Sequence, residues 1–578
     1  MLGVYNGNMK KELKNLLEKA ISSAQKANNW PHFELPEISI EYTKDEKFGD
    51  YTANIAMILA KKIGKSPMEI AENLKSQISN LNALNLEKIE VAVPGYINFY
   101  LSKKYLQDLV LKIANENGEF GNSTKKGEKV MVEFSQPNTH KEFHIGHLRN
   151  VFIGDALVKT IKKSGSEVVA ANYIGDTGTH IAKCLWGIEK FHQNENLDAL
   201  ENKAEFLGKV YSQAVKAIES NPEFEIEFKE LQKKFESGDL ELVELWKKTK
   251  QWSMDEFKKI YEKLGTKFDI YFWESEEELE GKKILPELVN VSCIKESQGA
   301  IVADFEKEGL GVLVLVRKDG SALYGLKDIP LAVRKFKEFN IDRSIVVVDL
   351  RQSLYFKQLF GILECMGFHK DMEHVGYEFV SLKGSETMSS RKGNIIPATY
   401  LIDETIKRVK EKFPNTEIAE EIGIGALKFY MLKYSSQTKI EYDIEESIKL
   451  DGATGPYVQY ACARINGILE KAKSEMGING IAGENRELLV HKKELSLIKE
   501  LNKFPELIEE IAKTYEVHKL AHYAIKLADK FHSFYDACRV IDAENEELTK
   551  ARLGLVYAVK IVLAETLELI GVSAPKQM

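Results

Sequence analysis

Three histidines fall within one short stretch of the chain, VEFSQPNTHKEFHIGHLRNV. They are His140, His144 and His147, with Gly146 between the last two. The stretch lies between a predicted strand and a predicted helix, where unpaired backbone N–H groups and the helix dipole favour phosphate. We therefore predict that His144 and His147 donate hydrogen bonds to the phosphates of a nucleotide, and that Gly146 leaves room for a purine ring.

The same histidines allow two other interpretations. On a continuous helix, spacings of four and three residues would bring His140, His144 and His147 together as zinc ligands. Pro137 and Gly146 argue against a continuous helix at this point. The second alternative is that the histidines are hydrogen-bonded core residues without a chemical role.

A second stretch, LKGSETMSSRKGN, combines glycine and serine with the adjacent cations Arg391 and Lys392. A loop of this composition suits closure over a triphosphate, because charge-assisted hydrogen bonds strengthen as negative charge builds on a leaving pyrophosphate. A solvated basic loop is the alternative, and the residues alone do not decide between the two.

The composition limits the classes of protein to which the chain can belong. Its 578 residues, 44% of them apolar, predict about four domains, or three with one enlarged, and exclude a mainly disordered chain. The net charge of −8 provides no overall positive field, so any nucleic-acid surface must be local. Five cysteines without a CxxC pair predict neither disulfides nor structural zinc, and favour a reducing cytoplasm. With no signal peptide and no apolar run of ~18 residues, we expect no membrane partner.

Sequence periodicity predicts a multi-domain α/β chain. Apolar spacing from Met9 to about Ala27 predicts a helix, KFGDYTANIAMILAKKIG and PMEIAENLKSQI predict two more, and IEVAVPGYINFYL predicts strands around a turn. We assign these elements to an N-terminal α+β module over residues 1–118.

A βαβ unit follows the linker GNSTKKGEK. A strand over 130–134, a helix over 147–163 and a strand over 168–173 would open a Rossmann-type, doubly wound parallel sheet. We assign residues 125–400 to this domain, with a helical insertion at about 187–300 before strand signals resume at GVLVLV, SIVVVDL and YEFVSL. Residues 401–578 are helical in pattern and are predicted to form a separate bundle domain.

The two loop stretches resemble the HIGH and KMSKS motifs of class I aminoacyl-tRNA synthetases. The chain resembles the arginyl-tRNA synthetase family in particular, through PNTHKEFHIGHLRN, NYIGDTGTHIAK, LYGLKDIPLA, DGATGPYVQYACAR, GDYTANIAMILAKK, PGYINFYL and APKQM, in the family's order. The resemblance implies ATP-dependent activation of L-arginine to arginyl-adenylate, with Mg²⁺ accompanying ATP. It further implies transfer of arginine to the terminal ribose of tRNA(Arg), with release of AMP and pyrophosphate.

The resemblance also implies which residues hold ATP. His144, Gly146 and His147 of the HIGH-like motif would bind ATP and steady its α-phosphate, by positioning and charge stabilisation rather than by a covalent intermediate. The KMSKS-like loop would add Met388, Ser389 and Lys392 to the ATP site.

That loop departs from the general motif, because Thr387 and Ser390 stand where its two lysines would be. Arg391 and Lys392 lie just downstream, and Lys141 lies a few residues before the HIGH-like motif, as lysines do in this family. We therefore assign pyrophosphate stabilisation jointly to these three cations.

A selective arginine pocket needs fixed carboxylates near an aromatic group, because the guanidinium is planar, permanently charged and rich in donors. The family pattern places Asp328 and Tyr324 there, with Glu274 as a second carboxylate. Without the resemblance, each carboxylate would be interpreted as a surface acid. Asn138 and Gln352 would hold the two ends of the amino acid. The full set for arginine is Glu133, Asn138, Glu274, Tyr324, Asp328 and Gln352.

Tyr457, Tyr460 and Arg464 are spaced by three and four residues, which places them on one face of a helix. Aromatic and arginine side chains stack on unpaired bases, so this face is a candidate RNA surface. The alternative is that the two tyrosines are core residues of a bundle.

The resemblance extends the candidate tRNA contacts to both ends of the chain. The C-terminal domain resembles an anticodon-binding domain, with Met578 close to the anticodon loop. The N-terminal module resembles the one that meets the tRNA elbow, where Asn98 and Tyr100 are the first residues to test.

Three rival functions remain to be compared with this interpretation. Another class I synthetase would lack the combination of Tyr324, Asp328 and Gln352. A tRNA-binding relative without catalysis would not need both ATP motifs, and a small-molecule nucleotidyltransferase would not need two flanking RNA-binding modules. We expect a cytoplasmic monomer that does not bind DNA and holds no metal ion of its own.

Overall fold

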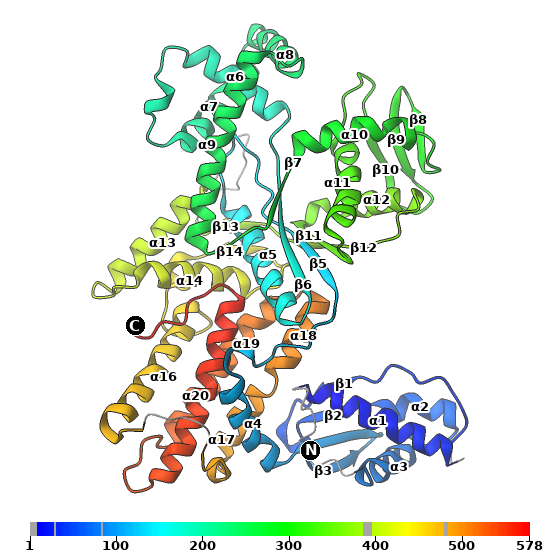
Figure 1. The fold of residues 1–578 in the computed structure, drawn as a ribbon, viewed down its shortest axis with the longest axis vertical. Helices are drawn as coiled ribbons and strands as arrows, with labels where there is room; N and C mark the ends of the chain where they lie inside the picture. The colour runs from blue at the N-terminus through cyan, green and yellow to red at the C-terminus, as the bar shows by residue number, and fades with distance from the viewer. Residues whose placement is uncertain (1–7, 28–29, 82–84, 385–395, 479–483) are drawn as a thin grey trace.

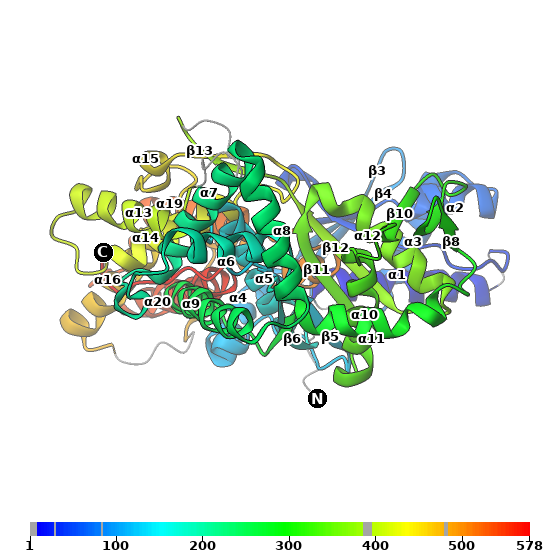
Figure 2. The same ribbon diagram turned by 90° about the horizontal axis from the view of Figure 1, so that it is seen from above.

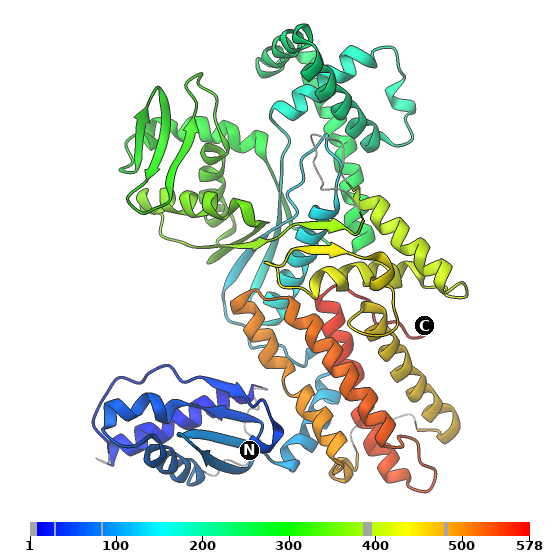
Figure 3. The same cartoon turned by 180° about the vertical axis from the view of Figure 1, so that it is seen from behind.

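The computed structural model describes residues 8–27, 30–81, 85–384, 396–478 and 484–578 (Figure 1). A parallel-sheet domain carries two additions, a helical insertion and a small α/β lobe, which stand side by side at one end of the molecule (Figures 1 and 3). The N-terminal module lies at the opposite end, and Figure 2 looks down on the end with the two additions. Among the described residues, none of the helices has both the length and the apolar character needed to cross a membrane.

The N-terminal module is an antiparallel sheet, in the order β1-β2-β4-β3, with three helices. The helix predicted over KFGDYTANIAMILAKKIG is wrong in its first half, because Tyr51 and Ala53 pair with Phe99 and Ile97 of β4 and the helix begins only at Ile55. The elements are α1 (Met9–Lys26), β1 (Ile40–Tyr42), β2 (Tyr51–Ala53), α2 (Ile55–Ile63), α3 (Pro67–Ser79), β3 (Leu86–Ala92) and β4 (Tyr96–Leu101).

Helix α4 (Lys103–Glu116) leaves this module and packs against the C-terminal bundle. Its Asp108 forms an ion pair with Arg486 at 2.9 Å, and its Gln107 donates a hydrogen bond to the Leu489 carbonyl at 3.2 Å. The two ends of the chain are therefore joined through one shared hydrophobic core.

The central domain has a five-stranded parallel sheet in the order β12-β11-β5-β6-β7, which confirms the predicted fold class. The predicted βαβ unit is present as β5 (Lys129–Glu133), α5 (Ile145–Lys163) and β6 (Glu167–Ile174). The remaining strands are β7 (Ile270–Trp273), β11 (Arg343–Asp349) and β12 (Asp371–Tyr377). The apolar run of β11 is buried, as expected for a central parallel strand.

The helical insertion is shorter than the predicted range of about 187–300. It consists of α6 (Thr179–Phe191), α7 (Lys203–Ser220), α8 (Pro222–Glu236) and α9 (Leu240–Leu264). Residues 270–273 then form β7 at the edge of the sheet, because they pair with Ala171–Ile174 of β6. The segment is too short for its sequence pattern to predict a strand.

The α/β lobe accounts for the rest of the predicted insertion. A three-stranded antiparallel sheet, β10-β9-β8, packs against helices, and the first two of its strands in sequence were not predicted because their charged residues obscure the alternation. The elements are α10 (Glu274–Leu288), β8 (Ile294–Ser297), β9 (Ala300–Phe305), β10 (Gly311–Val316), α11 (Tyr324–Phe339) and α12 (Ser353–Cys365).

The C-terminal part is mainly helical, as predicted. A short parallel pair, β13 (Val380–Leu382) and β14 (Ile440–Tyr442), links it to the central domain. Its helices are α13 (Ala398–Lys412), α14 (Ala419–Leu432), α15 (Ile444–Ser447), α16 (Gly455–Met476), α17 (Lys492–Leu501), α18 (Phe504–Thr514), α19 (His518–Ala537) and α20 (Glu546–Leu569).

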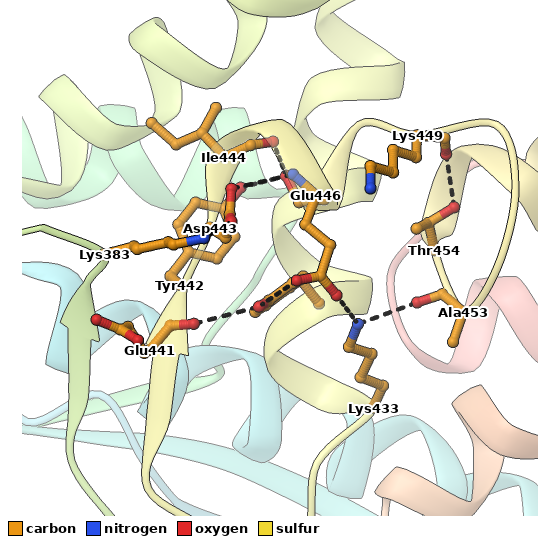
Figure 4. A network of polar contacts seen from close by, with 12 residues as sticks. Lys383, Lys433, Glu441, Tyr442, Asp443, Ile444, Glu446, Lys449, Ala453 and Thr454 are labelled. Atoms are coloured by element: carbon orange, nitrogen blue, oxygen red, sulfur yellow. Dashed lines mark hydrogen bonds and ion pairs between the residues drawn. The ribbon is translucent and has the colours of Figure 1, made fainter.

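A polar network holds this junction together (Figure 4). Lys383, just after β13, forms an ion pair with Asp443 at 2.7 Å, and Asp443 caps α15 by accepting the Glu446 N–H. Lys433 forms an ion pair with Glu446 at 3.4 Å and donates to the Ala453 carbonyl at 3.2 Å, just before α16. The network connects the end of the central domain to the start of the bundle.

Arg149, on α5, anchors the same junction from inside. Its side chain is fully buried and donates hydrogen bonds to the carbonyls of Glu378, Ser435 and Thr438. A buried guanidinium that satisfies three carbonyls fixes the position of the first helix of the central domain relative to the segments around β13 and β14.

Candidate active site

The HIGH-like motif forms the first turn of α5, and His144 is the N-cap residue of that helix. The His144 ring accepts a hydrogen bond from the Gly146 N–H at 3.1 Å, and the His144 N–H donates to Nδ1 of His147 at 3.1 Å. The two imidazole rings stack with their centroids 3.8 Å apart. In each ring Nδ1 is the acceptor, so a neutral ring carries its proton on Nε2 and can donate it to a ligand.

Both rings are neutral at physiological pH. Desolvation lowers the pKa of His144 to about 4, with a smaller contribution from the positive charge of Lys141. Desolvation also lowers the pKa of His147 well below its ordinary value. A pair of neutral N–H donors at a helix N-terminus suits phosphate oxygens and needs no compensating counter-ion when the site is empty.

Gly146 is required by the cap itself. A Cβ at this position would lie 3.1 Å from two atoms of the His144 ring, so a side chain would disturb the N-cap hydrogen bond. The glycine therefore serves the geometry of the histidine cap.

The loop before α5 is held in an unusual conformation. Ser135, Gln136 and His140 all have positive φ angles, which residues other than glycine rarely adopt. His140 is completely buried and contacts the Thr249 hydroxyl through Nε2 at 2.7 Å, so it anchors the loop to α9. It does not converge with the stacked pair, and no cluster suited to a metal ion occurs in the part of the chain that the structure describes.

The HIGH-like motif is joined by backbone hydrogen bonds to residues 396–398. The Ile145 N–H donates to the Ile396 carbonyl at 3.1 Å, and the Ala398 N–H donates to the Phe143 carbonyl at 2.8 Å. Ile396 and Ala398, at the start of the C-terminal part, are therefore attached directly to the HIGH-like motif. The loop residues named above, Thr387, Met388, Ser389, Ser390, Arg391 and Lys392, lie outside the described residues.

A cavity of about 590 Å³ opens at the carboxyl ends of β5, β6 and β11, next to the stacked histidines. The carboxyl edge of a parallel sheet is where such folds bind ligands. The cavity is lined by both histidines, His144 and His147, and by all six residues predicted for arginine: Glu133, Asn138, Glu274, Tyr324, Asp328 and Gln352. A larger groove of about 970 Å³ between α10 and α11 contains none of these residues.

The secondary-structure elements around the cavity hold its side chains in place. Glu133 ends β5, Glu274 begins α10, and Tyr324 and Asp328 lie in the first two turns of α11. Asn138 is held close to the backbone of Gly175, where a Cβ would lie 2.2 Å from its Oδ1. The glycine of NYIGD thus lets the loop after β5 and the loop after β6 touch.

Most of the carboxylates in the cavity already have a cation. Glu133 forms an ion pair with Lys335 at 2.5 Å, Glu274 with Lys327 at 3.1 Å, and Asp349 with Arg351 at 2.7 Å. Two of these pairs, Glu133–Lys335 and Glu274–Lys327, are buried. Lys327 is shared with Glu278 at 2.8 Å, and burial raises the pKa of Glu274 to about 7, so Glu274 carries only part of its charge at neutral pH.

Asp328 is different from the other three acids. Among the described residues it forms no ion pair, and it accepts a hydrogen bond from the Tyr355 hydroxyl. Burial raises the pKa of Asp328 to about 6, against the effect of that hydrogen bond. At neutral pH Asp328 is therefore mostly ionised and, among the described residues, has no cation within ion-pair distance, which suits a cationic ligand group.

Three side chains that control this charge balance were not predicted from the sequence. Lys327 and Lys335 pair with predicted arginine residues, and Tyr355 binds Asp328. Lys327 stands beside Asp328 within LYGLKD, so the motif contained it, and Lys335 follows two helical turns later on α11. Nothing in the sequence except its closeness to Gln352 indicated that Tyr355 belongs to the cavity.

Lys141 does not line the cavity. Its Nζ lies 5.7 Å from the ring of Tyr211 in the helical insertion, and its charge contributes to the lowered pKa values of His144 and His147. Lys141 is therefore close enough to both histidines for its charge to act on them.

The predicted RNA residues of α16 form a surface cluster with α19. The Tyr457 hydroxyl donates to Asp529 at 2.6 Å, and the Arg464 guanidinium lies 4.4 Å from the centre of the Tyr535 ring. Tyr460 is 41% exposed. Met578, also exposed, ends a tail whose Pro575 carbonyl accepts a hydrogen bond from Asn466 on the same helix.

The two N-terminal candidates differ in exposure. Asn98 is only 4% exposed, and its side chain accepts a hydrogen bond from Thr52 at 2.7 Å. Tyr100 is partly exposed, and Lys88 lies over its ring at 4.1 Å. Tyr100 is therefore the more accessible of the two for a direct contact.

Comparison with known proteins shows to which family the chain belongs. The chain matches the family models described as tRNA synthetases class I (R), catalytic domain, over residues 109–444, and DALR anticodon binding domain, over 458–578. A third model, Arginyl tRNA synthetase N terminal domain, matches residues 11–101. The chain belongs to the arginyl-tRNA synthetase family.

Relatives and solved structures of arginyl-tRNA synthetases cover nearly the whole chain. The arginine–tRNA ligase of Bdellovibrio bacteriovorus is 34% identical, with 98% of each chain covered. Arginine–tRNA ligase 1 of Bacillus cereus is 35% identical, covering 93% of this chain and 95% of the relative. The arginyl-tRNA synthetase structure from Thermus thermophilus has a TM-score of 0.82 at 28% identity, covering 98% of this chain and all of the other. The one from Plasmodium falciparum shares the fold, with a TM-score of 0.82 at 24% identity and 99% of each chain covered.

A stability measurement on the ligand-free synthetase tests the charge balance of the cavity. The pKa of Asp328 is higher in the folded protein than in the unfolded chain, so ionisation of this carboxyl group lowers the free energy of unfolding. This loss is complete above the folded pKa of about 6 and disappears as the pH falls to the pKa of the unfolded chain. Asp328→Asn should therefore raise the free energy of unfolding by about 2 kcal/mol at pH 7.5 and by clearly less at pH 5. Urea unfolding at both pH values checks this, with exposed Asp451→Asn as the control; equal effects of the two substitutions would contradict it.

Proposed function

We propose that this chain joins L-arginine to tRNA(Arg) in the two steps of its family, with the 590 Å³ cavity as the arginine site. In the first step, the arginine carboxylate attacks the α-phosphate of ATP and pyrophosphate leaves. In the second, a hydroxyl of the terminal ribose of tRNA attacks the carbonyl carbon of arginyl-adenylate and AMP leaves. The observation that carries the arginine assignment is the carboxylate of Asp328, ionised, without a cation and beside the phosphate corner of the sheet.

The stacked histidines would serve the first step. With Nδ1 of each ring occupied, the Nε2–H groups of His144 and His147 would donate to the α-phosphate as charge builds on it. Lys141, Arg391 and Lys392 would stabilise the leaving pyrophosphate, and Met388 and Ser389 would contact ATP. Mg²⁺ would arrive with ATP and neutralise charge on its phosphates.

The cavity residues would divide the recognition of arginine. Asp328 would pair with the guanidinium, and the exposed ring of Tyr324 would close over it. Glu133 and Glu274 would accept further N–H groups while remaining paired with Lys335 and Lys327. Asn138 and Gln352 would hold the α-amino and α-carboxylate ends.

This arrangement would also reject close analogues of arginine. Citrulline is neutral and would leave Asp328 as a buried charge without a partner. Lysine carries a charge but has a compact ammonium that cannot satisfy a carboxylate and a tyrosine in the plane that a guanidinium spans. Selectivity would come from unpaired groups rather than from the size of the cavity.

Replacing the charge at Asp328 tests this assignment. Asp328→Asn keeps the shape of the side chain but removes the charge-assisted interaction, so KM for arginine should rise by about 30-fold or more while KM for ATP stays the same. Steady-state charging assays with each substrate varied in turn would measure both constants. Glu276→Gln, an exposed acid on α10 outside the cavity, is the matched control. A normal KM for arginine in Asp328→Asn would remove this residue from the pocket.

The tRNA would contact both flanking parts of the chain. The Tyr457, Tyr460 and Arg464 face of α16, together with Met578 at the end of the tail, would stack on anticodon-loop bases. Tyr100 would contact the tRNA elbow directly, and Asn98 would act through Thr52 because it is buried.

We further propose that residues 1–118, 125–400 and 401–578 carry elbow binding, catalysis and anticodon binding respectively. The chain would work as a cytoplasmic monomer without DNA or a membrane as partner. Both ATP motifs and the arginine cavity favour an active enzyme over a tRNA-binding relative without catalysis.

Substitutions on α16 should separate tRNA binding from amino-acid binding. Tyr457→Ala and Arg464→Ala should each weaken tRNA binding by about 1 to 3 kcal/mol through lost stacking, and leave KM for arginine unchanged. Filter binding of tRNA would measure this, with exposed Arg317→Ala on the α/β lobe as the control. Thermal unfolding must be recorded in parallel, because Tyr457 and Arg464 also contact α19. Variants that fold normally and bind tRNA as the wild type does would exclude this face.

A further inference from the structure

The N-terminal module contacts the start of α18 through one buried carboxylate. Glu506, in the first turn of that helix, is only 4% exposed. Its Oε1 accepts the Lys10 N–H at 2.8 Å and the Tyr51 hydroxyl at 3.1 Å, and its Oε2 accepts the Tyr42 hydroxyl. All three donors belong to the N-terminal module, whereas Glu506 belongs to the C-terminal bundle beside it (Figures 1 and 3). Both oxygens of a buried acid are therefore satisfied by a different domain.

The start of α1 is held against the same helix by a second acid. Lys10 lies in the first turn of α1, where backbone N–H groups have no partner within the helix. Glu506 accepts from one of them, and Glu509, one turn further along α18, accepts from the Asn8 side chain at 2.9 Å. Asn8 is also the N-cap residue of α1, because its Oδ1 accepts the Lys11 N–H at 3.0 Å. Two carboxylates of α18 therefore fix the N-terminus of α1.

Further contacts with the bundle surround Tyr51 at the start of β2. Asn502, the C-cap residue of α17, donates to the Tyr51 hydroxyl at 2.8 Å and accepts from the Tyr105 hydroxyl of α4. Asp50, the residue before β2, forms an ion pair with Lys499 at 2.7 Å. The bundle thus holds two adjacent residues of the module, Asp50 and Tyr51.

These two residues connect the bundle to the proposed elbow contact. Tyr51 pairs with Phe99 of β4, and the Asp50 N–H donates to the Phe99 carbonyl at 2.8 Å. The Asp50 carboxylate also accepts the Leu101 N–H at 2.8 Å. Tyr100 lies between Phe99 and Leu101, so its position depends on how β2 is held against α18.

We propose that Glu506 is a positioning residue for tRNA, which fixes the N-terminal module so that the elbow and anticodon contacts reach one tRNA together. The effect on tRNA depends on the function proposed above, whereas the role of Glu506 in docking the module does not. Two linked contacts strengthen binding only when their spacing matches the ligand. A loosened module would lose this gain and leave the arginine cavity, which lies in the central domain, unchanged.

Amide hydrogen exchange of the full-length protein without tRNA tests the docking. Glu506→Ala removes the acceptor of the Lys10 N–H and of two tyrosine hydroxyls, so exchange in the first turn of α1 should become about tenfold faster or more. Glu506→Gln should stay close to the wild type, because its carbonyl can accept from Lys10 and its amide can donate to Tyr42. Glu510→Gln, on the same helix but paired with Lys519, is the control. Unchanged exchange in Glu506→Ala would overturn the docking role.

Steady-state charging tests the effect on tRNA. Glu506→Ala should raise KM for tRNA about tenfold, with kcat at saturating tRNA and KM for arginine and ATP unchanged, and Glu506→Gln should restore KM for tRNA. Tyr51→Phe removes a hydroxyl from the module without altering the bundle, and should shift exchange and KM for tRNA in the same direction. A normal KM for tRNA in Glu506→Ala, with faster exchange, would overturn the positioning role.

Double substitutions separate positioning from a general loss of stability. Glu506→Ala should add little to the effect of Tyr100→Ala on KM for tRNA, because both act through the elbow contact, and should add in full to Tyr457→Ala. Full addition to Tyr100→Ala would overturn the positioning role. A normal KM for tRNA in Tyr100→Ala alone would instead contradict the proposed elbow contact, while hydrogen exchange would still decide the docking.

Discussion

The proposed arginine site depends on one buried carboxylate, Asp328, that has no cation within ion-pair distance among the described residues. Three other acids line the same cavity, and each has a lysine or arginine within ion-pair distance. Asp328 has a tyrosine hydroxyl instead, and burial raises its pKa. An ionised, buried carboxylate lowers the stability of the folded protein. Such a group is typical of a functional site, where a bound ligand supplies the opposite charge.

The rest of the fold brings that carboxylate to the phosphate corner. The parallel sheet places the loops after β5 and β6 at one edge, and Gly175 lets those loops touch at Asn138. Arg149 and the backbone bonds between Phe143–Ile145 and Ile396–Ala398 hold α5 against the start of the C-terminal part. The HIGH-like motif and the start of the C-terminal part are thus connected through hydrogen bonds.

The sequence predicted the elements whose signals are local. The βαβ unit was predicted to within one or two residues at its outer ends, because glycines and apolar runs mark it, and the HIGH-like histidines were predicted at the start of a helix, where His144 is in fact the N-cap. The edge strand β7 was missed because its pairing with the distant strand β6 decides it, and β8 and β9 were missed because their charged residues obscure the alternation. The arginine residues could be chosen only through the family resemblance. Their pairing with Lys327, Lys335 and Tyr355 spans distances in the sequence that no local pattern encodes.

The central claim is that arginine binds to ionised Asp328, and the number of protons released on binding tests it most directly. With a pKa of about 6, Asp328 is half protonated in the empty site at pH 6 and must lose that proton to pair with a guanidinium. Burial also raises the pKa of Glu274 in the same cavity to about 7, so the test compares two proteins. Calorimetric titration of arginine in two buffers of different ionisation enthalpy should show that the wild type releases about half a proton more than Asp328→Asn at pH 6, and that the two differ little at pH 8. Binding without proton release at pH 6, or the same release in the variant, would contradict the account.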